Sequence, residues 1–199
     1  RCSHRNPNMA QIPRVGQPYG AECRGLFYAP HGWRQVGCDA SGLELRGLGA
    51  QLAYFDGGEY AKLVSTEGFD IHTHNAKLFG IYDGQGEIAK RIREQAKTLI
   101  YAVLYGAGAQ KLGTILDPSL GQYDQQDLGR ETIETFYKNL PAIKKLKDKV
   151  DERVLDRGYL IGIDGRHLQI RSRHSALNQL LQSTGCLLYT SPSPRDSCA

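Results

Sequence analysis

The sequence lacks the features that would direct a protein out of the cell or into a membrane. It has no apolar run long enough to span a bilayer, no signal peptide and no internal repeat. Its cysteines are odd in number and show no paired zinc-site spacing (Cys2, Cys23, Cys38, Cys186 and Cys198). These absences favour a soluble, intracellular protein with free thiols and no membrane partner. The 199 residues suffice for one or two domains with a core, and the net charge of +4 permits a polyanionic partner without requiring one.

Residues 93–105 carry the strongest pattern in the chain. Two cations and two tyrosines recur at every fourth position, which on a helix gives one slowly winding row (Arg93, Lys97, Tyr101 and Tyr105). A separate apolar stripe follows helical spacing and can be buried (Ala96, Leu99, Ile100 and Val103). Cations bind phosphates and flat rings stack on bases or sugars, so the row suits a nucleoside triphosphate. The same row also occurs on ordinary solvated helix faces.

Residues 35–55 predict a strand, a turn and a helix in succession. Gln35–Cys38 suits a short buried strand, Ser41-Gly42 is typical of a turn, and Leu43–Phe55 has leucines at helical spacing. Asp39 lies between the strand and the turn, where its carboxylate and the neighbouring carbonyl groups are free to bind a metal ion. An aspartate in this position is also a common helix N-cap or turn residue.

The rest of the sequence predicts an α+β protein that is mainly helical. Residues 1–34 are rich in proline, glycine and asparagine, and we expect them to be irregular with short extended pieces. Further helices are expected at about 71–80, 86–105, 129–139, 141–157 and 174–184. Asp164-Gly165, flanked by Tyr159–Ile163 and Arg166–Ile170, predicts a hairpin with a two-residue turn.

Two of these motifs together resemble family A, the polymerase I-like DNA polymerases. Asp39–Arg46 is similar to the first catalytic motif of that family, and Arg93–Gly106 is similar to the nucleotide-binding helix of its fingers. The variant is similar to replicative polymerases of short-tailed bacteriophages, which also have stretches like His4–Pro13 and Ala176–Gln182. The resemblance covers residues 1–185. It implies a right-hand polymerase fold, with mostly helical fingers on a partial antiparallel palm sheet, in the cytoplasm of an infected bacterium.

The resemblance also implies an order of domains. Residues 1–54 would be a palm segment with the first catalytic motif, 55–172 the fingers with the hairpin, and 173–185 a palm helix. From Cys186 the sequence departs from the family, and residues 186–199 resemble a translated sequencing adapter. Family members have a later His-Asp motif that supplies the second metal-bridging carboxylate. The 199 residues contain no such pair, so we expect this chain by itself to be inactive.

The implied chemistry is two-metal transfer of a dNTP onto a primer 3′-hydroxyl. Asp39 would bridge two Mg²⁺ ions and the carbonyl of Ala40 would bind one of them, because magnesium prefers hard oxygen ligands. Three basic side chains would bind the triphosphate (His72, Arg93 and Lys97), whereas we expect His74 to be solvated. The implied catalytic set is Asp39, Arg93, Lys97 and Tyr101. The implied nucleotide site adds Ala40, Ser41, Gly42, Leu43, Glu44, His72 and Tyr105.

Glu44 and Tyr101 bear on substrate choice. In the family, the glutamate of the first motif lies against the sugar 2′ position and excludes ribonucleotides. Glu44 therefore favours deoxynucleotides and argues against the alternative of a single-subunit, phage-type RNA polymerase. A glutamate here is also typical of an ordinary helix surface. Tyr101 implies tolerance of dideoxynucleotides, and Tyr105 would stack near the templating base.

The remaining implied contacts are to primer-template DNA. The resemblance places these residues near the minor groove or the template: Arg1, Tyr105, Gly108, His174, Asn178 and Gln182. Asn178 and Gln182 are four residues apart and share a helix face, which is also the pattern of an ordinary exposed helix. A non-catalytic remnant that only binds primer-template is the alternative function. A processivity factor would bind through a thumb domain that these residues do not include.

Overall fold

The computed structural model describes residues 12–36, 40–83 and 86–190, without the side chains of 188–190. By its internal contacts the chain divides into two units, Arg1–Ser41 and Gly42–Ala199. Two of the expected site residues, Arg1 and Asp39, lie outside the described residues. All of the helices that carry the other predicted side chains belong to the second unit.

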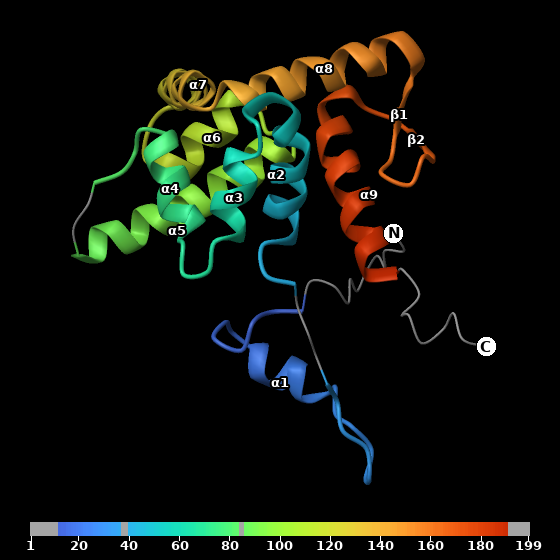
Figure 1. Ribbon diagram of the computed structural model, residues 1–199. Coiled ribbons are helices and arrows are strands. Elements are labelled where there is room, and N and C mark those ends of the chain that lie inside the picture. Colours follow the sequence, from blue (N-terminus) through green and yellow to red (C-terminus); the bar gives the residue numbers. More distant parts are fainter. Residues whose placement is uncertain (1–11, 37–39, 84–85, 191–199) are drawn as a thin grey trace. The chain divides into compact units, whose positions relative to one another are not determined.

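The second unit is mostly helical (Figure 1). Its helices are α2 (Leu43–Asp56), α3 (Glu59–Ser65), α4 (Ile71–Leu78), α5 (Gly86–Leu104), α6 (Ala109–Leu116), α7 (Gln122–Asn139), α8 (Pro141–Arg157) and α9 (Ala176–Thr190). A short 3₁₀ turn (Arg173–Ser175) precedes α9, and β1 (Tyr159–Ile161) pairs antiparallel with β2 (His167–Gln169). The predicted helices at α2, α4, α5 and α8 are confirmed within two residues at each end. No helix of the described chain is long and apolar enough to cross a membrane.

The first unit differs from its prediction in two places. It contains a short helix, α1 (Gly20–Gly25), within the stretch that we expected to be irregular. Gln35 and Val36, the described half of the predicted strand, are not in a strand, and Val36 is 89% exposed instead of buried. A strand needs a neighbour for its backbone hydrogen bonds. The described part of this unit offers no other strand, so the apolar pattern alone does not form one.

Helices α6 and α7 correct the prediction for residues 109–139. We predicted a helix from about residue 129, whereas α7 begins at Gln122, and α6 was not predicted. The glycines in this region lie at a close helix crossing. A Cβ atom on Gly113 would lie 1.8 Å from the carbonyl oxygen of Gln125, and one on Gly129 would lie 1.9 Å from that of Ala109. These glycines thus permit backbone contact between two helices and do not end either one.

The hairpin is confirmed, but its turn is different from the predicted one. Each strand has three residues, with Leu160 opposite Leu168. Beyond them, the N–H of Gly162 donates to the carbonyl of Arg166 (2.9 Å), and the N–H of Gly165 donates to that of Gly162 (2.9 Å). Gly165 has a φ of +82°, and it is the only positive-φ residue in the loop. The loop therefore has three residues, a type I turn followed by a left-handed glycine, because Asp164 does not adopt the positive φ of a two-residue turn.

The end of the chain also differs from expectation. Helix α9 continues to Thr190, beyond the predicted end near residue 184 and through the first residues of the expected non-family tail. Helix α3, a short element between α2 and α4, was not predicted either.

In the described residues the hairpin forms the whole sheet, so the expected palm sheet is not observed there. The fold is mostly helical with a small antiparallel sheet.

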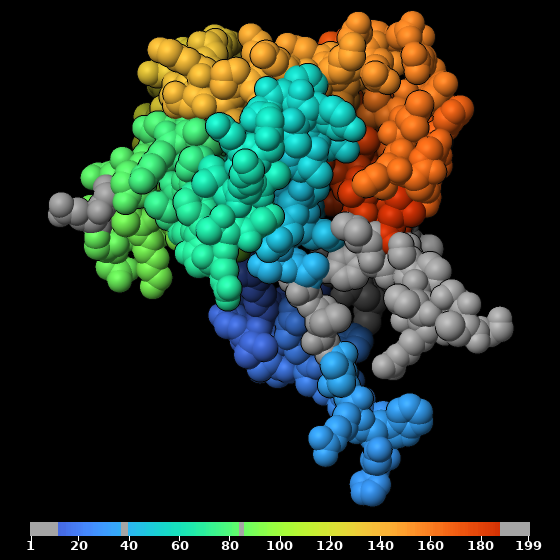
Figure 2. All heavy atoms as spheres, viewed as in Figure 1, coloured from blue at the N-terminus to red at the C-terminus, as the bar shows by residue number. Residues whose placement is uncertain are grey.

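One hydrophobic core joins the helices of the second unit. The predicted apolar faces of α2 and α5 are buried in it, together with those of α8 and α9 (Leu45, Leu48, Leu52, Ala96, Leu99, Ile100, Val103, Ile143, Leu146, Val150, Leu177, Leu180 and Leu181). Phe79, which follows α4, stacks on Phe136 of α7 with ring centroids 4.2 Å apart. Helix α2 packs against both α3 and α9, and α4 packs against α5. In Figure 2 the α2–α4 surface adjoins that of α8. This packing brings the first turn of α2 close to α9.

Candidate functional site

Helix α5 presents its predicted row along one edge. Arg93, Lys97 and Tyr101 are half-buried, and Tyr105, immediately after the helix, is 45% exposed. The N–H of Tyr105 donates to the carbonyl of Tyr101 (2.9 Å), so the helical path continues through the last member of the row. The two tyrosine rings lie 6.3 Å apart. The row is therefore accessible from one side, while the apolar stripe anchors the helix from the other.

The carboxylate of Asp70 connects the row to helix α4. Its Oδ2 accepts hydrogen bonds from Arg93 Nε (2.7 Å) and Thr73 Oγ1 (2.6 Å), and its Oδ1 accepts one from the backbone N–H of His72 (3.2 Å). Partial burial would raise the pKa of Asp70, but the hydrogen bonds from Arg93 and Thr73 and the charge of Arg93 lower it overall. Arg93 Nη1 also donates to Glu94 (2.8 Å). Asp70 is thus charged and binds both the start of α4 and the first cation of the row.

His72 lies in the field of the same cations. Burial lowers its pKa, and the positive charges of Arg93 and Lys97 lower it further against the opposing charges of Asp70 and Glu94. Its Nδ1 is buried, with no hydrogen-bond partner in the described structure. Because the imidazole is neutral above its lowered pKa, its other nitrogen, Nε2, carries the proton in the tautomer that leaves Nδ1 bare. The group can donate one hydrogen bond to a bound oxygen.

Acidification should destabilise the chain through His72. A folded-state pKa below 6.5 means that the unfolded chain binds more protons, so stability is lost as the pH falls from about 6.5 toward the folded-state pKa. Asp70, with a pKa below 3.8, stays charged in that range. We expect urea denaturation between pH 7.5 and 5.5 to show a weaker loss of stability in His72→Gln than in the unchanged chain. Equal pH slopes would contradict the prediction.

His74 behaves differently from the expectation that it is solvated. It is half-buried, and its ring packs on Phe69 with centroids 5.6 Å apart. Burial and the charge of Lys77 lower its pKa. The exposed position inferred for it is therefore wrong, because Phe69, just before α4, covers one side of the imidazole. His74→Gln should also weaken the pH dependence, so the double variant should weaken it most.

Residues from three predicted motifs meet at the carboxylate of Glu44. Its Oε1 accepts hydrogen bonds from the hydroxyl of Tyr105 (3.2 Å) and from Nε2 of Gln182 (3.0 Å). The Tyr101 ring lies 6.3 Å from that of Tyr105, and its pKa is raised by burial and by the negative charge of Glu44. Glu44 is therefore no ordinary helix-surface residue. Two side chains that lie 61 and 138 residues from Glu44 in sequence thus converge on one acceptor.

Gly106 brings the end of the row against the segment before α9. Its φ is +76°, and a Cβ atom there would lie 2.1 Å from the carbonyl oxygen of His174. The positive φ and the close approach are two separate requirements for glycine at this position. Gly108, the N-cap residue of α6, has a φ of −73° and open space around its Cβ position, so it has neither requirement. The side chain of His174 is exposed, and a ring nitrogen lies 3.0 Å from Ser172 Oγ.

Of the remaining predicted residues, some belong to the second unit and two belong to the first. Gly42 is the N-cap residue of α2, with a φ of +61°, and Leu43 is the first residue of the helix. Gly185 of α9 lies so close that an added Cβ would be 3.1 Å from the Leu43 side chain. Asn178 is on α9 as predicted, and its Oδ1 is buried without a hydrogen-bond partner among the described residues. Ala40 and Ser41 belong to the first unit, so their placement relative to α5 is not defined. In the described part of the chain no three acidic, histidine or cysteine side chains gather as a metal site.

The prediction missed Asp70. The sequence contains a signal for it, since an aspartate before a helical run is a typical N-cap, and it directly precedes Ile71-His72-Thr73. Its pairing with Arg93, 23 residues away, has no such signal.

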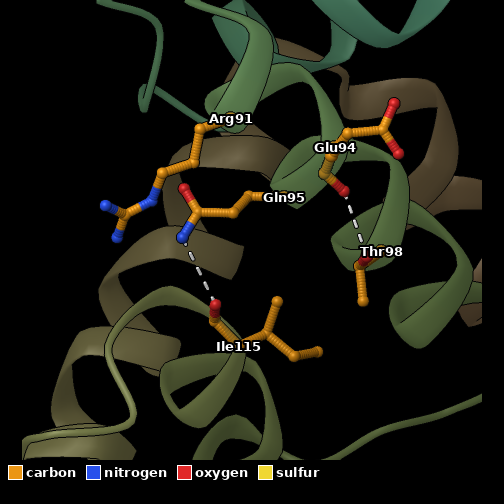
Figure 3. Close-up of a pocket in the computed structure, with 5 residues that line it drawn as sticks. All are labelled: Arg91, Glu94, Gln95, Thr98 and Ile115. Carbon is orange, nitrogen blue, oxygen red and sulfur yellow. Dashed lines mark hydrogen bonds between the residues drawn. The ribbon is translucent and has the colours of Figure 1, made fainter. Parts of the chain in front are cut away.

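A hollow lies beside α5, away from Arg93, and is lined by Arg91, Glu94, Gln95, Thr98 and Ile115 (Figure 3). Gln95 Nε2 donates across it to the carbonyl oxygens of Ile115 (3.5 Å) and Leu116 (3.2 Å), near the end of α6. The hollow thus lies at the contact between α5 and α6. Arg91 lies two residues before Arg93, about 200° around the helix, and so points away from the row.

Comparisons with known proteins agree on the family. The sequence matches the model of DNA polymerase family A over residues 1–186. The DNA-directed DNA polymerases of Escherichia phage T7 and Enterobacteria phage T3 are both 39% identical, over 94% of this chain and 27% of each relative. Among solved structures, the chain is similar to the POL domain of Pol1 from M. smegmatis in complex with DNA primer-template and dNTP. That match has a TM-score of 0.65 at 20% identity and covers 92% of this chain and 32% of the other.

The phage relatives confirm the resemblance to bacteriophage polymerases, and the solved structure supports the fold. This chain spans about a quarter of the length of those phage enzymes. The family model nevertheless covers nearly all of the 199 residues. The chain therefore belongs to DNA polymerase family A.

Proposed function

We propose that these residues are the nucleotide-binding and primer-end part of a template-directed DNA polymerase that acts in DNA replication. The observation that carries the proposal is the convergence of Tyr105 and Gln182 on the carboxylate of Glu44. Each of these residues comes from a motif to which the family resemblance assigns a different role: the sugar, the template base and the primer end. Their meeting at one acceptor is what a site for an incoming nucleotide beside a primer terminus requires.

The triphosphate would bind along α4 and α5. Arg93 and Lys97 supply positive charge, and Nε2 of His72, which carries the proton when Nδ1 is bare, supplies a hydrogen-bond donor. Phosphoryl transfer depends on positioning and on neutralising the charge around the reacting phosphorus, and this group provides both. Tyr101 would lie beside the sugar, where its hydroxyl replaces a missing 3′-hydroxyl contact. Glu44 would exclude a 2′-hydroxyl from the same place.

Two Mg²⁺ ions would activate the primer 3′-hydroxyl and stabilise the leaving pyrophosphate. Asp39 and the carbonyl oxygen of Ala40 are the proposed ligands, and both are of the hard-oxygen type. A polypeptide of these 199 residues alone has no His-Asp pair for the second bridging carboxylate. We therefore expect it to bind nucleotide without extending a primer.

The primer-template would lie against the N-terminal half of α9. Asn178 and Gln182 are proposed to touch the minor groove, together with Arg1, while His174, Gly108 and Tyr105 lie toward the template. The buried, unpartnered Oδ1 of Asn178 supports this assignment, because such an atom is normally satisfied by a ligand or water. The palm and fingers boundaries given above, at 54/55 and 172/173, belong to the same proposal.

The proposal can be tested by replacing the corresponding segment of the phage T7 polymerase with residues 1–185 of this chain. We expect magnesium-dependent primer extension with dNTPs, and a loss of more than about 10²-fold in rate for Asp39→Asn, because the bridging carboxylate positions both ions. Extension by the chimaera that survives Asp39→Asn would overturn the proposal. Primer-template binding without extension, in a folded chimaera, would instead favour the non-catalytic binding remnant. The family match leaves a phage-type RNA polymerase unsupported.

A further inference from the structure

We infer that Asp70 is a positioning residue of the triphosphate site, and that one carboxylate sets both the start of the His72 helix and the direction of the Arg93 guanidinium. The inference rests on the proposed function and extends it to a residue outside the implied binding set. Asp70 would not contact the nucleotide itself. It would act through the two side chains that do.

The geometry supports a shared anchor. Asp70 has an extended backbone (φ −87°, ψ 92°) and caps α4, with Oδ1 accepting from the N–H of His72 (3.2 Å). Its Oδ2 accepts from Arg93 Nε at 2.7 Å, which is the length of a charge-assisted hydrogen bond. The first turn of α4 and the middle of α5 are therefore tied at one point. Loss of this carboxylate would free both ends of the anion site at once.

The hydrogen bonds of Arg93 involve two of its three guanidinium nitrogens, so the third can bind a ligand. Nε is bound by Asp70, Nη1 by Glu94, and within the described structure Nη2 makes no hydrogen bond. A planar guanidinium fixed at two nitrogens has little rotational freedom left, so a phosphate oxygen that binds Nη2 orders almost nothing new. Preorganisation of this kind strengthens binding without an additional contact.

The negative charge of Asp70 should weaken triphosphate binding, but this effect is smaller than the gain from positioning. A carboxylate beside an anion site repels a triphosphate and partly neutralises Arg93. However, the Arg93 and Asp70 side chains are 38% and 39% exposed, and solvent screens charges at that exposure. The positioning of two ligand-binding groups should therefore outweigh the repulsion, and this fixes the sign of the expected result.

Asp70→Asn and Asp70→Ala test the inference, with Asp56→Ala as the matched control. Asp56, the last residue of α2, likewise accepts from backbone N–H groups at the start of the next helix, α3 (Gly58, 2.8 Å, and Tyr60, 3.1 Å), and no cation of the described chain pairs with it. Binding of dATP and of inorganic tripolyphosphate to the 199-residue chain would be measured by calorimetry. We expect a roughly fivefold or greater loss of affinity for Asp70→Ala and a smaller loss for Asp70→Asn, which keeps a cap acceptor.

The pKa of His72 is a second measurement, and loss of a helix cap alone would not change it in the same way. Asp70 raises the pKa of His72 against the stronger opposing effects, so Asp70→Asn should lower that pKa further in an NMR titration, whereas Asp56→Ala should leave it unchanged. Unchanged or tighter triphosphate binding by folded Asp70 variants would overturn the inference alone. Absence of binding by the unsubstituted chain would overturn the proposed triphosphate site as well. An equal loss of affinity in Asp56→Ala would reduce Asp70 to an ordinary helix cap.

Discussion

Replacement of Gly106 by alanine should destabilise the second unit by about 2–5 kcal/mol. The left-handed backbone at φ +76° costs a residue with a Cβ atom, and that atom would lie 2.1 Å from the carbonyl oxygen of His174. Either the loop after α5 or the segment before α9 must move. For a chain of this size, the melting temperature should fall by roughly 4–20 °C, as followed by circular dichroism.

Gly108→Ala is the matched control for this substitution. Gly108 lies two residues away in the same loop, has a φ of −73° and has open space at its Cβ position. Its replacement should leave the melting temperature nearly unchanged. Because Tyr105 adjoins Gly106, the Gly106 variant should also loosen the hydrogen bond between Tyr105 and Glu44. Equal melting temperatures for the two variants would mean that the contact with His174 is not maintained in solution.

Replacement of Arg93 by alanine should reduce dATP affinity by roughly 10- to 150-fold, since a hydrogen bond to a charged group contributes about 1.5–3 kcal/mol. The substitution also leaves Asp70 without its cation, so an uncompensated carboxylate would then face the triphosphate. Both effects weaken binding. Equilibrium titration of the 199-residue chain with dATP at fixed ionic strength would measure the loss.

Arg91→Ala separates position from net charge. It removes the same charge from the same helix, but Arg91 lines the other face together with Gln95 and Ile115. At physiological salt, charges beyond about 8 Å are largely screened, so we expect less than a twofold change in affinity. Similar losses for Arg91→Ala and Arg93→Ala would show that the chain binds the triphosphate through its overall charge and not at the proposed row.

The sequence predicted the elements whose residues carry a strong period. Helix α5 has an apolar stripe over several turns, and α8 begins at a proline suited to a first helical position, so both were placed correctly. The strand at Gln35–Val36 failed because strand formation depends on a neighbour that local pattern does not reveal. Helix α7 was predicted from about residue 129 but begins at Gln122, so Gly129 lies inside the helix, where it permits the close contact with α6.

The residues of the candidate site were predicted from their spacing and from motif resemblance, whereas most of their contacts were not. The spacing of Arg93, Lys97 and Tyr101 indicated a shared face, and the structure confirms that face. The contacts of Glu44 with Gln182 and of Arg93 with Asp70 join distant segments, and no local pattern encodes them. Likewise, the half-buried environment of His74 depends on the ring of Phe69. Such pairings arise only when the helices pack.

The interlocked glycines of α6 and α7 have a mechanical consequence. With the carbonyl oxygens of Gln125 and Ala109 filling the space where Cβ atoms would otherwise stand, neither helix can slide along the other without bringing a side chain into that gap. The hydrogen bond from Gln95 to the carbonyl oxygen of Leu116 also connects α5 to the end of α6. We therefore expect α5, α6 and α7 to move together when the edge of α5 that carries Arg93 is displaced.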